Sequence, residues 1–128
     1  MKTVSIILVM LIFPLMNIFG QGHDRQPVVS GSFYPSGSER LKSELAGYFA
    51  SCGKPDAGAR VRAIIVPHAG YVYSGHTAAA GFAAIPSDAA YDNIFLIGVS
   101  HRYGFEGAAV FSAGNLATPL GTLKVNME

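Results

Sequence analysis

The sequence is poor in charge. Charged residues make up 13% of the 128 residues, while apolar residues make up 50%. This balance is typical of one globular domain at most and argues against a disordered chain. The nine basic and eight acidic side chains are spread along the chain and leave a formal net charge of +1. Without a basic stripe to attract phosphates, we expect no nucleic-acid partner.

Cysteine and the common catalytic motifs are also scarce. The single cysteine, Cys52, cannot form an internal disulfide, and we expect it to be a buried apolar residue at the end of a helix. The sequence has no G-x-S-x-G, P-loop, G-x-G-x-x-G or C-x-x-C pattern. These absences argue against a serine hydrolase, a nucleotide-binding protein and a zinc ribbon.

The N-terminus has the order of a secretory signal. Lys2 precedes a nearly continuous apolar run at residues 4–13, and small or polar residues follow. The run is shorter than the roughly 20 residues that a membrane-spanning helix needs. We therefore expect residues 1–21 to be a signal peptide, and the cleaved chain to be exported to the periplasm or the medium without membrane attachment. An uncleaved N-terminal anchor is the alternative.

Two helices are expected in the remaining chain. Ser36 and Glu39 have the spacing of a capping box, and apolar residues then recur on one helical face as far as Cys52. The alanine-rich run 75–85 predicts a second helix, with Ser74 as its N-cap.

Four short runs predict strands. Residues 61–66 and 93–98 are apolar and rich in β-branched or aromatic side chains, and 108–111 and 123–125 predict a third and a fourth strand. Strand, helix and strand in this order are typical of a right-handed βαβ unit. The fold class expected for residues 22–128 is therefore α/β, a partial parallel or mixed sheet flanked by helices.

Two histidines follow the first two predicted strands. His68 comes two residues after one strand, and His101 comes three residues after the other. The carboxyl ends of parallel strands share one edge of a sheet, so the imidazoles of neighbouring strands would lie about 5 Å apart. Two neutral imidazoles can hold a divalent transition metal such as iron, copper or zinc. A loop histidine with no ligand role is the commoner case and remains the alternative.

Other polar side chains surround this pair in the sequence. Tyr71 is expected in an aromatic wall of the pocket, while Ser100 and Arg102 flank His101 and would orient it or hold an anionic ligand. His76 falls in the first turn of the second predicted helix, where capping or packing is the expected role.

Four motifs occur in an order that resembles the Memo family, whose bacterial and archaeal members are also called AmmeMemoRadiSam system protein B. They are Gly-Ser-Phe-Tyr-Pro at 31–35, Ala-Ile-Ile-Val-Pro-His-Ala-Gly-Tyr at 63–71, Ile-Gly-Val-Ser-His at 97–101 and Thr-Pro-Leu-Gly at 118–121. The resemblance covers residues 27–126.

The resemblance implies a fold related to the class III extradiol, LigB-type dioxygenases. It implies a metal site that takes one histidine from each motif loop, at His68 and His101, with iron or copper as the preferred ion. It further implies non-haem redox or dioxygenase-like chemistry and a functional link to AMMECR1-like and radical SAM proteins. The expected ligand is a small molecule or a peptide.

The sequence departs from the family pattern in two respects. Family members are longer and supply a third ligand, a cysteine, from a later part of the chain. Cys52 does not lie at the matching position, and Arg102 stands where another histidine is common. We therefore expect the N-terminal part of a Memo-like domain, a fragment of a truncated LigB/Memo-like fold. A non-catalytic scaffold that binds its ligand in the same pocket and an inactive gene fragment are the alternatives.

The 128-residue chain alone is expected to be catalytically inactive, because two histidines leave most of the coordination sphere of a metal to water. Incubation of the isolated chain with a catechol and iron should give no ring-cleaved product. Turnover above that of free iron would contradict this expectation.

Overall fold

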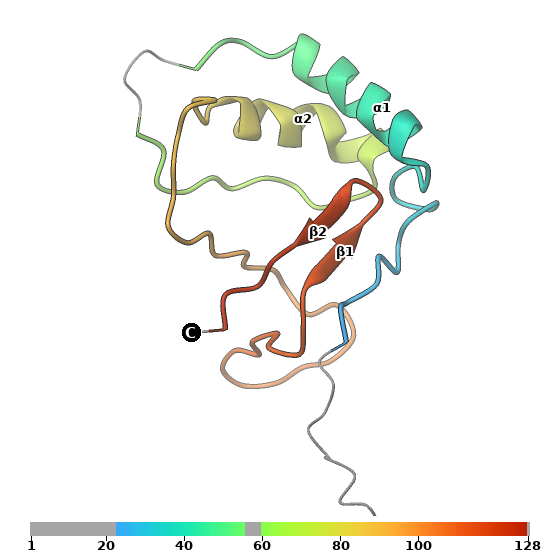
Figure 1. The fold of residues 1–128 in the computed structure, drawn as a ribbon, viewed down its shortest axis with the longest axis vertical. Coiled ribbons are helices and arrows are strands. Elements are labelled where there is room, and N and C mark those ends of the chain that lie inside the picture. The colour runs from blue at the N-terminus through green and yellow to red at the C-terminus, as the bar shows by residue number, and fades with distance from the viewer. Residues whose placement is uncertain (1–22, 56–59, 128) are drawn as a thin grey trace, which may run out of the picture.

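The computed structural model describes residues 23–55 and 60–127 (Figure 1). It contains helix α1 (Ser38–Ala50), helix α2 (Tyr71–Ala83) and two short strands, β1 (Leu116–Thr118) and β2 (Gly121–Leu123). The mixed α/β class is confirmed. The predicted signal peptide, residues 1–21, lies outside the described residues. Neither described helix is long and apolar enough to cross a membrane.

Helix α1 forms where it was predicted, but without the predicted cap. Gly37 is the N-cap and makes no side-chain capping bond, so the capping box assigned to Ser36 and Glu39 is wrong. Ser36 lies one residue before the N-cap, and Glu39 instead pairs with Lys42 at 3.0 Å. The helix buries Leu41 and ends at Ala50, two residues before Cys52.

Helix α2 begins at Tyr71, four residues earlier than predicted, with Gly70 as its N-cap. Ser74 therefore does not cap the helix but is buried inside it, and its hydroxyl donates to the carbonyl of Ala69 at 2.8 Å. This bond to the preceding turn satisfies the hydroxyl without interrupting the helix. The connection between the predicted strand 61–66 and the helix is thus shortened to residues 67–70, and His68 lies three residues before the start of α2.

Two glycines let α2 pack closely on both sides. A Cβ on Gly75 would lie 2.6 Å from the ring of Tyr48 in α1, and a Cβ on Gly81 would lie 2.5 Å from Cγ1 of Val66. Helix α2 is therefore held between α1 and the segment 61–68, as Figure 1 shows. Ala79 of α2 is buried in this layer.

The predicted parallel sheet is not formed among the described residues. Segments 61–66, 93–98 and 108–111 have no strand assignment, and no backbone–backbone bond joins the first two to another described residue. A side-chain bond is found next to them instead: the hydroxyl of Tyr91, two residues before segment 93–98, donates to the carbonyl of Val61 at 2.8 Å. A central strand needs a hydrogen-bonded neighbour on each edge, and the described residues supply no such neighbour for segments 61–66 and 93–98.

The sheet that does form is an antiparallel hairpin near the C-terminus. Leu116 pairs with Leu123 and Thr118 with Gly121, so the predicted strand 123–125 shares only Leu123 with β2. The Thr118 hydroxyl closes the turn, because it accepts the Leu120 N–H at 3.1 Å and donates to the carbonyl of Gly121 at 2.8 Å. Arg25 joins the edge of β1 by two backbone bonds, to Asn115 at 2.7 Å and Ala117 at 3.0 Å.

Replacing Gly75 by alanine should destabilise the helical layer by about 1–3 kcal/mol, because the new methyl group overlaps the Tyr48 ring. Gly47→Ala is the matched control: Gly47 lies in α1 with nothing near its Cβ, so alanine should leave stability unchanged or raise it by up to about 1 kcal/mol. The measurement is the urea midpoint for loss of helical circular dichroism. Equal midpoints for the two variants would contradict the packing described.

Candidate metal centre

The structure brings together the two histidines that the sequence singles out. The Nε2 atoms of His68 and His101 lie 3.0 Å apart, although 33 positions separate them in the chain. Their ring centroids are 5.2 Å apart and the ring planes are inclined by 43°. Both residues are exposed, so solvent reaches the pair. The expected proximity is thus present, although the parallel sheet that predicted it is not.

A separation of 3.0 Å is compatible with two chemical states. In the first, one neutral imidazole donates an N–H to the unprotonated nitrogen of the other. In the second, both unprotonated nitrogens face one ion; for metal–nitrogen distances of 2.0–2.1 Å, the angle at the ion is roughly 90–100°. Two protonated imidazoles would repel each other at this distance.

The bend that carries His68 is fixed by short contacts. The N–H of Tyr71 donates to the carbonyl of Phe33 at 2.8 Å, and the Ser74 hydroxyl holds the carbonyl of Ala69. A Cβ on Gly70 would lie 3.6 Å from the Phe33 backbone, so the bend lies directly against the segment 29–34. The start of α2 and the Phe33 segment therefore both fix the bend that carries His68.

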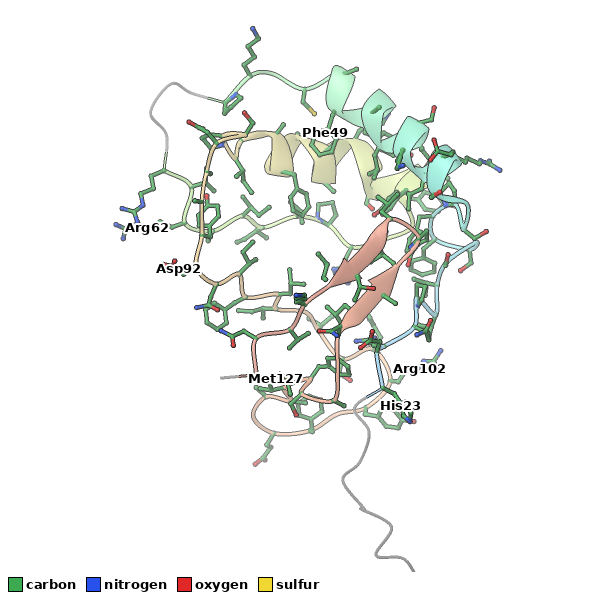
Figure 2. All side chains as sticks on the ribbon, in the orientation of Figure 1. His23, Phe49, Arg62, Asp92, Arg102 and Met127 are labelled. Atoms are coloured by element: carbon green, nitrogen blue, oxygen red, sulfur yellow. The ribbon has the colours of Figure 1, made fainter. Side chains whose placement is uncertain are left out.

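The turn that carries His101 is closed by its neighbour Ser100. The Ser100 hydroxyl donates to the carbonyl of Tyr103 at 2.6 Å and accepts the Tyr103 N–H at 3.2 Å. Ser100 thus shapes the turn around His101. Arg102 is exposed, and in the view of Figure 2 it lies toward the end of the molecule away from helices α1 and α2.

Tyr71, the first residue of α2, packs in a cluster with Tyr34 and Tyr48. Its ring lies 5.4 Å from that of Tyr34, and its carbonyl lies 3.2 Å from the Tyr48 hydroxyl, which is also 2.8 Å from Oε1 of Glu44. The hydrogen bond to Glu44 raises the pKa of Tyr48 above its ordinary value, with smaller contributions from desolvation and from the negative charge of Glu44. Burial raises the pKa of Tyr71, and Tyr34 and Glu44 add to this effect. Tyr48 therefore links α1 to the first residue of α2.

An apolar cavity of about 310 Å³ lies between the two helices and the segments 29–34 and 66–69, with His68 and Tyr71 in its wall. His101, Ser100 and Arg102 do not line it. The lining residues are Val29, Phe33, Tyr34, Leu45, Tyr48, Phe49, Val66, Pro67, His68, Ala69, Tyr71, Ser74, Gly75, Ala78, Ala79 and Phe82. The histidine pair and the cavity are therefore adjacent through His68.

The described residues supply no third ligand beside the pair, since no group of three His, Cys, Asp or Glu side chains is found among them. Cys52 lies just beyond the end of α1, close to where it is predicted, but it is half-buried and not buried, and its Sγ lies 3.4 Å from the carbonyl of Tyr48. His76 packs edge-on against the Tyr48 ring, with centroids 4.7 Å apart, and its Nδ1 lies 3.4 Å from the Ser51 hydroxyl.

Sequence reasoning missed the positioning residues Tyr48 and Ser74. The sequence predicts Ser74 as an N-cap, and its signal for Tyr48 is the place of this residue on the apolar face of the first predicted helix. Neither pattern indicates that the Ser74 hydroxyl reaches the carbonyl of Ala69, or that the Tyr48 hydroxyl reaches the carbonyl of Tyr71.

The structure thus defines a mixed α/β chain in which the rings of His68 and His101 face each other. The family model for Memo-like proteins matches residues 25–128. A MEMO1 family protein of Thermococcus onnurineus is 39% identical over 104 residues, and one of Methanosarcina acetivorans is 38% identical over 104 residues. The memo-1 homolog of Caenorhabditis elegans is 37% identical over 117 residues.

The chain belongs to the Memo family. These matches cover 81%, 81% and 88% of this chain, but 35%, 37% and 32% of the respective relatives. The chain therefore spans about a third of the length of the relatives it matches.

Alkaline pH should loosen the contact between α1 and the start of α2. The raised pKa of Tyr48 means that its contribution to stability is present below the ordinary tyrosine pKa of about 10 and is lost as the pH rises through the folded-state value. Tyr48→Phe should therefore reduce the fall in thermal midpoint between about pH 8 and about pH 11. Tyr73→Phe, at an exposed position of α2, is the control. A fall of the same size in wild type and Tyr48→Phe would contradict this role of Tyr48.

Proposed function

We propose that His68 and His101 bind a divalent transition metal, and that the chain forms the histidine-bearing part of a Memo-family metal centre. The observation that supports this proposal is the 3.0 Å separation of the two Nε2 atoms. Two exposed imidazoles with facing nitrogens are a donor set suited to iron, copper or zinc. The 3.0 Å distance fits either a hydrogen bond between the two imidazoles or a shared ion. We propose the shared ion, with both unprotonated nitrogens as its ligands.

The separation also bears on which metal fits best. An angle near 90° at the ion matches neighbouring positions of an octahedral or square-planar site, while a tetrahedral site places two nitrogens at roughly 3.3–3.4 Å. The observed 3.0 Å is compatible with iron or copper, the ions that the family resemblance implies. Iron or copper is accordingly the proposed ion.

A bound ion would supply redox or dioxygenase-like chemistry in the complete Memo-type protein, as the family resemblance implies. The residues of this chain contribute binding and orientation. His68 is held by the bend before α2, and His101 by the turn that Ser100 closes. The adjoining cavity would place apolar side chains on one side of His68. The cysteine that the resemblance implies as third ligand would come from another part of such a protein.

The cavity favours a second candidate function, a scaffold that holds a small apolar ligand without catalysis. Its volume of about 310 Å³ and its aromatic lining suit a ligand of this kind. In this case the histidine pair would be a hydrogen-bonded contact between the two loops.

Titration of the chain with Cu²⁺ or Fe²⁺ should show one ion bound per chain. His68→Ala and His101→Ala should each weaken binding on the order of tenfold or more, because a single imidazole loses the chelate. His23→Ala, at an exposed histidine outside the pair, should leave the affinity unchanged. Isothermal titration calorimetry under reducing, anaerobic conditions for Fe²⁺ makes the measurement.

The same titration separates the two candidate functions. Metal affinity that is equal in wild type and in the double variant His68→Ala/His101→Ala would exclude the metal centre. Unchanged binding of indole to that double variant, together with no metal uptake by wild type, would favour the scaffold.

A further inference from the structure

Three partly buried tyrosines, each from a different segment of the chain, pack together next to the bend that carries His68. The ring centroid of Tyr71 lies 5.4 Å from that of Tyr34 and 6.4 Å from that of Tyr48. Both separations are in the range of contacting aromatic pairs. The other tyrosines of the chain are exposed. Tyr34, Tyr48 and Tyr71, called here the tyrosine cluster, are therefore rings between which an electron can pass by contact.

The tyrosine cluster borders the same cavity as His68. This cavity of about 310 Å³ has His68 and all three rings in its wall. Tyr71 follows His68 by three residues, and the bond from its N–H to the carbonyl of Phe33 fixes the bend between them. An oxidant held at the position of His68 would therefore lie next to the cluster, with Tyr71 as the nearest of its rings along the chain.

Tyr48 is the member of the cluster that has a base within reach. Its hydroxyl lies 2.8 Å from Oε1 of Glu44, one helical turn earlier in α1, which is close enough for proton transfer. The hydroxyls of Tyr34 and Tyr71 make no hydrogen bond to a described residue. The bond to Glu44 raises the pKa of Tyr48, so the phenol keeps its proton at neutral pH. Because a phenol becomes strongly acidic when it loses an electron, a partnered base favours oxidation at Tyr48.

We propose that Tyr48 is a redox-active tyrosine, which donates an electron through the Tyr71 ring to a one-electron oxidant at the position of His68. The phenolic O–H bond breaks: the electron reduces the oxidant, the proton passes to the carboxylate of Glu44, and a neutral tyrosyl radical remains. Ascorbate, which gives one electron and one proton, restores the phenol. This donor property of Tyr48 does not depend on a bound metal.

Beside the proposed metal centre the donor has a protective role, and this role rests on that proposed function. When a reduced iron or copper ion meets hydrogen peroxide, cleavage of the O–O bond to give two water molecules takes up two electrons and two protons. The ion supplies one electron and Tyr48 the other; one proton comes from Tyr48 through Glu44 and one from solvent. The second electron is then taken from a phenol, so His68 and His101 are spared from oxidation.

A purely structural role of Tyr48 is the rival explanation, because its hydroxyl also lies 3.2 Å from the carbonyl of Tyr71 and joins the two helices. The two explanations differ in what they require of Glu44. A structural contact needs only a hydrogen-bond acceptor, which glutamine supplies, whereas proton transfer needs a carboxylate. Glu44→Gln therefore separates them, and Tyr48→Phe removes the donor altogether.

A ruthenium photo-oxidant attached to the full 128-residue chain tests the donor without a bound ion. A thiol-reactive ruthenium tris(bipyridine) derivative is attached at position 68 of the parent variant His68→Cys/Cys52→Ser. A light flash in the presence of an external electron acceptor then generates Ru(III) at that position. We expect a tyrosyl radical in the transient absorption and EPR spectra of the parent.

The radical yield should fall by about tenfold or more when Glu44→Gln or Tyr48→Phe is added to the parent, since each change removes proton transfer to the carboxylate. Tyr73→Phe is the matched control, because Tyr73 is exposed on α2 outside the cluster, and it should keep the yield of the parent. Deuterium oxide should slow radical formation in the parent, an effect that a structural role does not produce. Helical circular dichroism shows whether α1 and α2 persist in each variant.

Hydrogen peroxide tests the protective role on the chain loaded with one equivalent of Fe²⁺. The iron content of each sample is measured first, and mass spectrometry then measures oxidation of His68 and His101. We expect severalfold more oxidised histidine in Tyr48→Phe and in Glu44→Gln than in wild type or Tyr73→Phe.

The outcomes separate the donor, the protective role and the metal centre. Equal radical yields in the parent, Glu44→Gln and Tyr48→Phe would overturn the donor and leave the Tyr48 bond as a structural contact. Equal histidine oxidation in wild-type and Tyr48→Phe chains that both hold iron would overturn the protective role alone. A chain that binds no iron but forms the radical that depends on Glu44 would refute the metal centre and the protective role, while supporting the donor.

Discussion

The close packing of helix α2 between α1 and segment 61–68 is the contact on which the arrangement depends. Gly75 admits the Tyr48 ring and Gly81 admits Val66, so α2 starts at a fixed place relative to both neighbours. His68 lies three residues before that start, and the Tyr48 hydroxyl reaches the carbonyl of Tyr71. Small residues in the middle of one helix thereby set the position of an imidazole at its end.

The histidine pair follows from two turns that are each closed by local bonds. Ser74 and the N–H of Tyr71 hold the bend at His68, and Ser100 closes the turn that contains His101. The two turns place the Nε2 atoms at a distance that one ion can bridge. Membership of the Memo family adds weight to the proposed metal centre, because the motifs that carry both histidines lie within the matched residues 25–128.

The sequence predicted the helices and the histidine pair better than the sheet. Helical periodicity and alanine content are local signals, so both helices were found, although the start of α2 was missed because Ser74 resembled a cap. The apolar runs at 61–66 and 93–98 were recognised as buried-strand sequences, yet a ladder needs partner strands. The described residues do not supply them. The two motif loops predicted His68 and His101, whereas the contacts of Tyr48 depend on packing that no local pattern encodes.

Whether the two imidazoles hold one ion can be measured by X-ray absorption spectroscopy of the chain loaded with one equivalent of copper. We expect two imidazole nitrogens at about 2.0 Å from the metal, with one of them lost in either His68→Ala or His101→Ala. A spectrum with fewer than two imidazoles, or one that neither substitution changes, would contradict it.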